Sequence, residues 1–259
     1  MPRVALGVEY DGGDFVGWQA QRNGRSVQDV LTAAVSRVAA ERVTLQGAGR
    51  TDAGVHALQQ VVHFDTLASR EPRQWVLGIN SNLPPDVRVH WAKAVGSEFD
   101  ARRSATARRY RYLILCSSTE SPLLRRRVWW LRTELDCAAM SRAALAWLGE
   151  QDFSAFRAAS CQSRSPRRFL ASVGVARRPP LVALEFTANA FLHHMVRNLV
   201  GALVEIGAKR ASADWAAALL AGRDRRAGAV TAPAQGLTLV DVSYPARFEI
   251  PAASCETEV

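Results

Sequence analysis

The sequence predicts an α+β protein made of two similar halves, each with an antiparallel sheet and helices packed on one face. Short segments with alternating apolar residues predict strands, and longer segments with apolar residues on one helical face predict helices. The strands outnumber the helices, and the helices are spread through both halves. The chain has 259 residues and a hydrophobic content of 48%, enough for one large domain or two smaller ones with real cores.

The first half begins with a strand and a capped helix. Apolar residues alternate from Val4 to Tyr10 and predict a half-buried strand, which ends at a turn over residues 11–13. Ser26 and Asp29 resemble a capping box at the start of a helix with one apolar face. In chain order, we expect a strand at 4–10, a helix at 27–38, a strand at 59–64, a helix at 75–79 that stops near 83–85, and a strand at 87–95.

The segment 96–109 is small, polar and rich in arginine, which indicates the junction between two domains. We therefore predict an N-terminal domain at 1–100 and a C-terminal domain at 101–259. The elements expected in the second are a strand at 110–114, a helix at 137–148, a hairpin of 173–176 with 182–186, helices at 195–207 and 214–220, and a strand at 237–242.

The charge of the chain indicates an anionic partner. Lys and Arg number 33 against 24 Asp and Glu, a net charge of +9, and the isoelectric point is near 10.2. Lys93 and Lys209 are the only lysines, so 31 of the 33 cations are arginine. Arginine binds phosphate bidentately and stacks on bases, which suits RNA, although a GC-rich genome gives the same bias.

The cysteines show no C-x-x-C pairing, and the histidines do not stand at metal-ligand spacing with them. We expect free thiols at Cys116, Cys137, Cys161 and Cys255, and no bound metal. The N-terminus lacks a signal-peptide pattern, and no apolar run approaches the roughly 20 residues of a membrane span. A cytoplasmic protein is expected.

The run GAGRTDAGVHALQQVVHF at 47–64 is the most informative feature of the chain. Its glycines allow a sharp turn and a close approach of backbone to a ligand. Arg50 and Asp52 lie together in this loop, and the β-branched and aromatic residues up to Phe64 indicate that the loop leads into a strand. A carboxylate between a tight loop and a strand is well placed for chemistry.

Asp52 has three interpretations. With Thr51 it can simply satisfy the backbone of a turn. An aspartic protease needs two carboxylates that share a proton, but no second such loop exists and Arg50 favours ionisation. The third interpretation is an ionised nucleophile or base that acts on an anionic substrate, and the basic composition favours it.

Six motifs occur in order along nearly the whole chain. They are YDG with Phe15, Gly17, Trp18 and Gln19; GAGRTDAGVHA at 47–57; Asn82-Leu83-Pro84; ATARRYRY at 105–112; CQSR at 161–164; and FLHHMVRN at 191–198. With these motifs the chain resembles the tRNA pseudouridine synthases of the A type. Six motifs in the right order are far more specific than any one of them.

The resemblance implies isomerisation of uridine to pseudouridine at tRNA positions 38, 39 and 40 in the anticodon stem-loop, without cofactor or metal, by a homodimer. The base must leave its ribose, rotate and reattach through carbon, so a nucleophile is needed to hold one fragment. Asp52 can add to the sugar, add to the base, or abstract a sugar proton, and all three remain open. The paired target must also flip out of its stack.

The resemblance implies a role for three further residues. Arg50 assists base flipping, or it clamps a phosphate or pairs with Asp52. Tyr110 lies beneath the flipped base, where its ring stacks and its hydroxyl serves the C5 proton transfer, or it is a core aromatic paired with Tyr112. Arg197 partners the aspartate from the opposite half, which implies an active-site cleft between the halves; otherwise it is a surface cation.

Two segments are implied to contact tRNA. Their residues are Phe99, Asp100, Ala101, Arg102, Arg103, Ser160, Cys161, Gln162, Ser163 and Arg164. The family commonly has FHARF where this chain has FDARR, so the acid at Asp100 weakens phosphate binding locally and Arg103 can compensate. The alternative function is a non-catalytic RNA-binding protein on the same fold. The intact set of Asp52, Arg50, Tyr110 and Arg197 argues against it.

Overall fold

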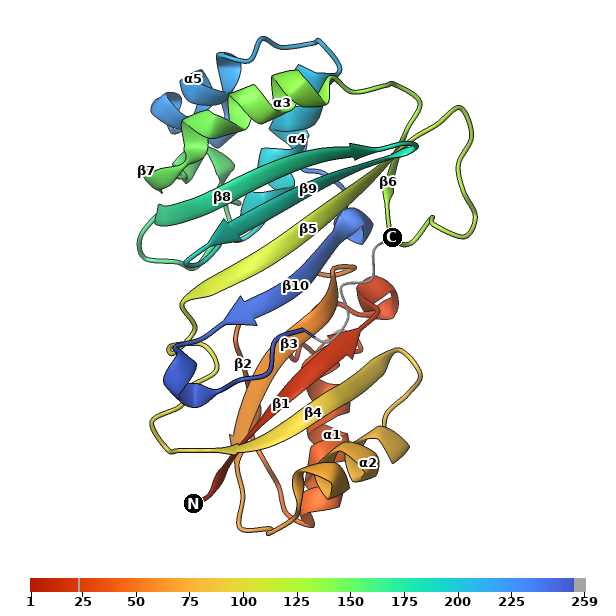
Figure 1. The fold of residues 1–259 in the computed structure, drawn as a ribbon, viewed down its shortest axis with the longest axis vertical. Coiled ribbons are helices and arrows are strands. Elements are labelled where there is room, and N and C mark those ends of the chain that lie inside the picture. Colours follow the sequence, from red (N-terminus) through yellow and green to blue (C-terminus); the bar gives the residue numbers. More distant parts are fainter. Residues whose placement is uncertain (23, 254–259) are drawn as a thin grey trace. The chain divides into compact units, whose positions relative to one another are not determined.

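A computed structural model describes residues 1–22 and 24–253 of the chain (Figure 1). The structure confirms the mixed α+β class. The chain divides into two compact units: unit 1 is Met1–Ala107 with Leu239–Val259, and unit 2 is Arg108–Thr238. Within the described ranges, every helix is too short or too polar to cross a membrane.

Unit 1 is built on strands of a sheet with two helices beside them. Its elements are β1 (Arg3–Tyr10), α1 (Val27–Ala39), β2 (Gln46–Gly47), β3 (His56–Asp65), α2 (Pro72–Ser81), β4 (Val87–Val95) and most of β10 (Leu237–Ser243). The strand order is β4-β1-β3-β10, and β2 pairs with β3 beside this path. Since β1 runs antiparallel to both β3 and β4, its apolar residues lie in the centre of the unit.

The two helices of unit 1 begin at local capping signals. Ser26 caps α1 by accepting a hydrogen bond from the Asp29 amide at 3.1 Å, as the sequence predicts. Helix α2 begins three residues before the expected Trp75, because Pro72 stands at its first position and Glu71 forms a capping box with Gln74. These signals precede the apolar pattern that marked the helix in the sequence.

The C-terminal segment belongs to unit 1, whereas the sequence assigned it to the second domain. Strand β10 lies next to β3 in the sheet. Beyond it, the Tyr244 hydroxyl donates to the Ala101 carbonyl at 2.6 Å, and the Phe248 ring packs against Phe99 with 5.2 Å between centroids. These long-range contacts tie the end of the chain to its first hundred residues, which no local pattern reveals.

Unit 2 contains the remaining strands of the same ten-stranded sheet and three helices, so within the described residues the two separate sheets that the sequence predicts are not found. Its elements are β5 (Ala107–Cys116), β6 (Trp129–Leu131), α3 (Cys137–Ala144), β7 (Gly149–Asp152), β8 (Arg167–Arg178), β9 (Leu181–Ala188), α4 (Met195–Gly207) and α5 (Trp215–Gly222). The strand order is β5-β9-β8-β7, with β6 parallel to β5. The predicted hairpin exists but is longer, because polar residues at the start of β8 pair through their backbone with β7 and β9.

The helices of unit 2 follow the sequence pattern with one difference. The expected helix over 137–148 is α-helical only to Ala144, and a 3₁₀ turn over Leu145–Trp147 follows it. This turn buries the Trp147 indole, whose Nε1 donates to the Ala216 carbonyl at 3.0 Å. Helix α4 has the predicted bounds, and all its residues except Arg197 and Glu205 are buried.

Three of the four cysteines are free thiols, as predicted: Cys116, Cys137 and Cys161. Cys255 lies outside the described residues.

Candidate functional site

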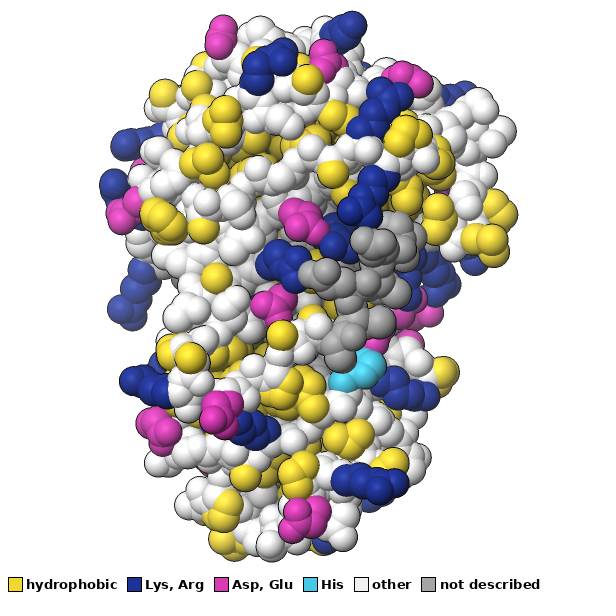
Figure 2. All heavy atoms as spheres, in the orientation of Figure 1, with side chains coloured by type: hydrophobic (Ala, Val, Ile, Leu, Met, Phe, Trp, Pro, Cys, Tyr) yellow, Lys and Arg dark blue, Asp and Glu magenta, His cyan; other side chains and the backbone are white. Residues whose placement is uncertain are grey.

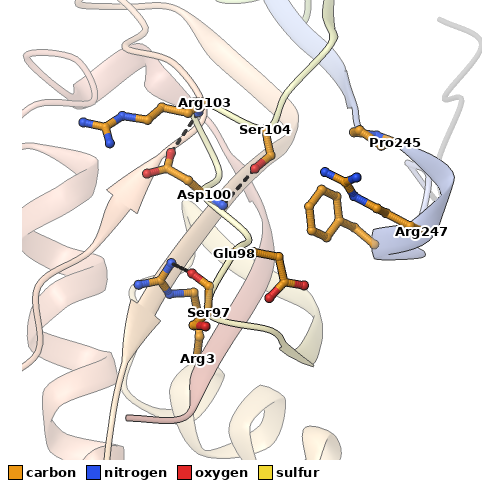
Figure 3. A pocket seen from close by; sticks show the side chains of 9 residues that line it. Arg3, Ser97, Glu98, Asp100, Arg103, Ser104, Pro245 and Arg247 are labelled. Carbon is orange, nitrogen blue, oxygen red and sulfur yellow. Dashed lines mark hydrogen bonds between the residues drawn. The ribbon is translucent and has the colours of Figure 1, made fainter.

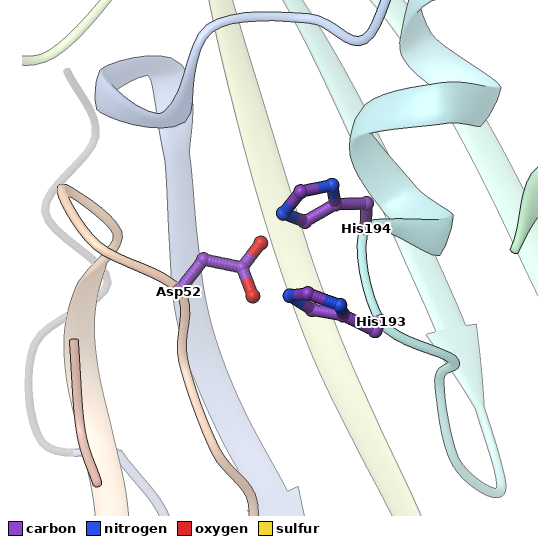
Figure 4. A group of neighbouring side chains, drawn as sticks. All are labelled: Asp52, His193 and His194. Atoms are coloured by element: carbon purple, nitrogen blue, oxygen red, sulfur yellow. The ribbon is translucent and has the colours of Figure 1, made fainter. Parts of the chain in front are cut away.

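Arg50 and Asp52 lie in the loop that joins β2 to β3 in unit 1, where Figure 4 labels Asp52. Arg50 is exposed, Asp52 is half-buried, and Thr51 between them is buried. The backbone turns directly after Asp52, whose carbonyl accepts the Val55 amide at 3.2 Å, and Gly54 adopts a φ of +79°. The glycine is therefore required for the turn that the sequence predicts here.

The opening motif of the chain forms the support for this loop. The Trp18 amide donates to the Thr51 carbonyl at 3.0 Å, and the Gly54 amide donates to the Phe15 carbonyl at 3.4 Å. Gly17 has a φ of +107°, and a Cβ there would lie 2.7 Å from the Thr51 oxygen. The two motifs thus fit together only because Gly17 lacks a side chain.

A buried polar network lies under the same loop. The Tyr10 and Thr51 hydroxyl oxygens are 2.8 Å apart, and the Gln60 amide nitrogen donates to the Gly49 carbonyl at 2.8 Å. Burial raises the pKa of Tyr10 to about 12, although hydrogen bonding by Thr51 and Gln60 opposes the rise. Tyr10 is therefore neutral at physiological pH. Tyr10 belongs to the YDG motif, whereas Gln60 is marked in the sequence only as a polar residue on a core strand.

The segment 99–103 is anchored at the other end of β3. Phe99 and Ala101 are completely buried, and the Ala101 amide donates to Nδ1 of His63 at 3.1 Å. Arg102 and Arg103 are exposed. Since His56 and His63 mark the two ends, this segment and the Asp52 loop are separated by about 23 Å along the strand. Within this segment the two arginines are exposed and Asp100 is half-buried.

Asp100 directs its carboxylate to its own turn. Its Oδ1 accepts the amides of Arg102 and Arg103 at 2.9 and 2.8 Å. Burial disfavours the Asp100 carboxylate, but the amides of Arg103 and Arg102 and the nearby positive charges outweigh it and lower its pKa. The negative charge of Asp100 is thus stabilised by hydrogen bonds from the amides of its own turn.

A pocket of about 510 Å³ opens beside this turn (Figure 3). Its charged lining residues are Arg3, Glu98, Asp100, Arg103 and Arg247. The Arg3 guanidinium already binds Asp65 bidentately at 2.7 and 2.9 Å.

In unit 2, Tyr110 lies on β5 with 8% of its surface exposed. Its ring packs edge-to-face against Phe191, with 5.2 Å between centroids. Tyr112 is two residues along, and its hydroxyl donates to the Pro233 carbonyl at 2.7 Å. Burial raises the pKa of Tyr112, and the charge of Arg197 opposes this rise. Tyr110 therefore has a ring partner in the FLHHMVRN motif.

Arg197 is held on the flank of α4. Its Nε donates to the Ala232 carbonyl at 2.7 Å, and the Ala232 amide donates back to the Arg197 carbonyl at 3.2 Å. Asn198, the next residue, is 3% exposed. Its amide nitrogen donates to the Phe156 carbonyl at 2.8 Å, while its Oδ1 accepts Thr231 at 2.7 Å and Arg225 at 3.0 Å. Asn198 thus joins α4 to the segment that contacts Arg197.

The segment 160–164 lies beside the start of α4. The Ser160 hydroxyl is 3.1 Å from Nδ1 of His193, and the Ala158 amide donates to the His193 carbonyl at 3.0 Å. His193 and His194 directly precede α4 (Figure 4), and their ring centroids are 4.0 Å apart. Unit 2 therefore brings part of segment 160–164 to the same motif that contacts Tyr110 and carries Arg197.

Basic side chains are widely distributed. On the face drawn in Figure 2, Lys and Arg occur on both units with Asp and Glu among them.

Comparison with known proteins gives consistent matches. The family described as tRNA pseudouridine synthase matches residues 7–102 and 143–245. Proteins named tRNA pseudouridine synthase A from Escherichia fergusonii, Escherichia coli and Shigella boydii are each 51% identical over 249 residues, covering 96% of this chain and 92% of theirs. A chain from a solved Cbf5-Nop10-Gar1 complex aligns with a TM-score of 0.35 and 12% identity over 78% of this chain and 44% of that one, too weakly to bear on the fold.

Proposed function

This chain belongs to the tRNA pseudouridine synthase family, and we propose that it isomerises uridine to pseudouridine at positions 38, 39 and 40 of the tRNA anticodon stem-loop. The observation that carries the proposal is the GAGRTDAGVHA loop, which presents Asp52 on a rigid turn next to an exposed arginine. The identity of 51% over 96% of the chain supports the same substrate class.

Asp52 is the proposed nucleophile or base. The reaction breaks the bond between N1 of the base and C1′ of the ribose, and forms a bond from C5 to C1′. The C5 proton is lost and N1 gains a proton, so substrate and product contain the same atoms and no oxidant or co-reactant is consumed. A half-buried carboxylate on a fixed loop supplies the group that holds or activates one fragment while the other rotates.

Tyr110 and Arg197 complete the proposed catalytic set. The Tyr110 ring offers a stacking surface, and its hydroxyl offers a group for the C5 proton transfer. Arg197 has its Nε fixed by Ala232, so the position of its guanidinium is restricted. It is the proposed partner of the Asp52 carboxylate.

Substrate binding is assigned to Arg50 and to the segments 99–103 and 160–164. Arg50 is the proposed base-flipping residue, because it is exposed and two positions from Asp52. Arg102, Arg103 and Arg164 are exposed and suited to phosphate. Family membership also supports a homodimer in the cytoplasm, and light scattering in solution measures the oligomeric state.

The function is tested by tritium release from tRNA that carries C5-labelled uridine. The wild-type protein should release the label, and Asp52→Asn should release none while its tRNA affinity stays within about tenfold. Removal of a negative charge is not expected to weaken binding to an anion. Binding without release by the wild-type protein would instead identify a non-catalytic RNA-binding protein. Substantial turnover by Asp52→Asn would exclude this residue as nucleophile.

A further inference from the structure

We propose that Thr51, Tyr10 and Gln60 are positioning residues that fix the Arg50–Asp52 segment from its buried side. The inference rests on the proposed function, in which Asp52 is the catalytic carboxylate. None of these three residues needs to touch the substrate. Their effect is on the direction in which the loop presents Asp52.

Thr51 is the point at which the loop is attached to the core. It is 6% exposed, whereas its neighbours Arg50 and Asp52 are exposed and half-buried. Its hydroxyl oxygen lies 2.8 Å from the Tyr10 hydroxyl, and its carbonyl accepts the Trp18 amide at 3.0 Å. Because Thr51 is bonded to Asp52 through one peptide, fixing both its side chain and its carbonyl restricts the orientation of the next residue.

Gln60 fixes the loop on the other side of Arg50. Its side chain is fully buried, and its amide nitrogen donates to the Gly49 carbonyl at 2.8 Å. Its Oε1 is buried and makes no hydrogen bond among the described residues. A buried carbonyl oxygen without a donor destabilises a fold. Through the bond to Gly49, Gln60 fixes the loop before Arg50.

Tyr10 connects this network to the sheet. It is 2% exposed on β1, and its ring lies beside Trp18 with 6.2 Å between centroids. Because the phenol is neutral at physiological pH, its hydroxyl can both donate and accept a hydrogen bond. The loop is thus held at Gly49 and at Thr51, one residue on each side of Arg50.

Thr51→Val tests the inference because it removes the hydroxyl and keeps the branched shape. We expect kcat to fall by about tenfold or more while KM changes by less than about threefold, since small displacements of a catalytic group have large effects on rate. Tyr10→Phe should have the same effect, because it removes the other hydroxyl of the pair. Thr51→Ser should recover most of kcat.

Thr66→Val is the matched control. Thr66 is completely buried directly after the end of β3, where its hydroxyl donates to Glu41 and accepts the Ala68 amide at 3.0 Å. The control should lower the melting temperature but leave kcat within about twofold, because a loss of stability alone does not move Asp52. A purely structural role of Thr51 predicts the same behaviour for both valine variants.

The outcomes separate this inference from the proposed function. If Asp52→Asn is inactive but Thr51→Val and Tyr10→Phe keep normal kcat, the positioning role is wrong and the proposed function stands. Substantial turnover by Asp52→Asn overturns the positioning role, because Asp52 is then not the catalytic carboxylate. The proposed function itself is overturned only if the wild-type protein binds tRNA without releasing the label. Folding of each variant is checked by circular dichroism. If Thr51→Val does not fold, the positioning role is tested by Tyr10→Phe alone, because this variant keeps the ring that packs beside Trp18. A fall in kcat of equal size in Thr66→Val also contradicts the positioning role.

Discussion

The loop that carries Asp52 and the helix that carries Arg197 hold their side chains in different ways. The loop is supported by backbone hydrogen bonds to Phe15 and Trp18, near the start of the chain. The close approach of this segment is possible because Gly17 has no side chain. The helix is regular, but its flank depends on Arg225 and Thr231, which lie 27 and 33 residues after Asn198.

The difference shows which kind of support can be predicted from a sequence and which cannot. Glycines with positive φ and tight turns have strong residue preferences, so the loop appears in the sequence as a motif. A helix needs no special residue to form, and the partners of Asn198 in a distant segment are ordinary polar residues. The support of the loop can therefore be predicted in part from the sequence, whereas the support of Arg197 cannot.

After Asp52→Asn, the largest effect is expected from Tyr110→Phe. The variant keeps the ring contact with Phe191 but loses the hydroxyl, so turnover should fall by about 10²-fold or more with tRNA affinity nearly unchanged. Tyr112→Phe is the control on the same strand: it should lower stability by about 1 kcal/mol, because the Pro233 carbonyl loses its donor, with a much smaller effect on turnover. Near-normal turnover of Tyr110→Phe would return this residue to the core-aromatic interpretation.

Asn198→Ala tests whether the helix flank depends on its remote partners. It removes the acceptor of Arg225 and Thr231 and the donor to the Phe156 carbonyl, so the free energy of unfolding should fall by about 2–4 kcal/mol. Thr231→Val removes a single bond and should lower it by about 1 kcal/mol. Urea denaturation measures both. An unchanged stability of Asn198→Ala would show that α4 supports its own flank.

Arg102, Arg103 and Arg164 should act in phosphate binding, whereas Arg50 should act in catalysis. The logarithm of tRNA affinity should fall linearly with the logarithm of salt concentration, and Arg102→Ala, Arg103→Ala or Arg164→Ala should reduce the slope by about one per lost contact. Arg50→Ala should instead lower the saturated rate more than the affinity. Arg73→Ala, on the exposed side of α2, is the control and should keep the slope. If the salt slope is unchanged in the variants of both segments, the assignment of these arginines to phosphate binding is wrong.

The smallest expected effect is a loss of stability at acidic pH, caused by His63, which anchors the segment 99–103. Burial, together with the charge of Arg3, lowers the pKa of His63 below its ordinary value of 6.5. The neutral ring accepts the Ala101 amide, so this contribution is fully present above pH 6.5 and is lost as the pH falls toward the folded pKa. The free energy of unfolding, measured by denaturation, should decline between pH 7.5 and 5.5, and this decline should be smaller in His63→Gln. The same decline in the variant would assign the effect to another group.

The sequence by itself determined the features that depend on neighbours in the chain. The bounds of β4 and α4, the Ser26 cap and the turn at Gly54 follow from periodicity, capping and backbone preference. The motifs also determined the family. The roles of Arg50, Asp52, Tyr110 and Arg197 stay predictions until the variants are measured.

Only the tertiary structure decided the features that depend on remote partners. The short strands β2, β6 and β7 exist because other strands pair with them, and their two to four residues are too few for a periodic signal. The burial of Phe99 and Ala101 in a predicted RNA-contact segment follows from packing against His63, Tyr244 and Phe248. The placement of Tyr10, Thr51 and Gln60 under one loop has the same origin. Local preference is encoded residue by residue, but a hydrogen bond across 41 positions exists only after the chain has folded.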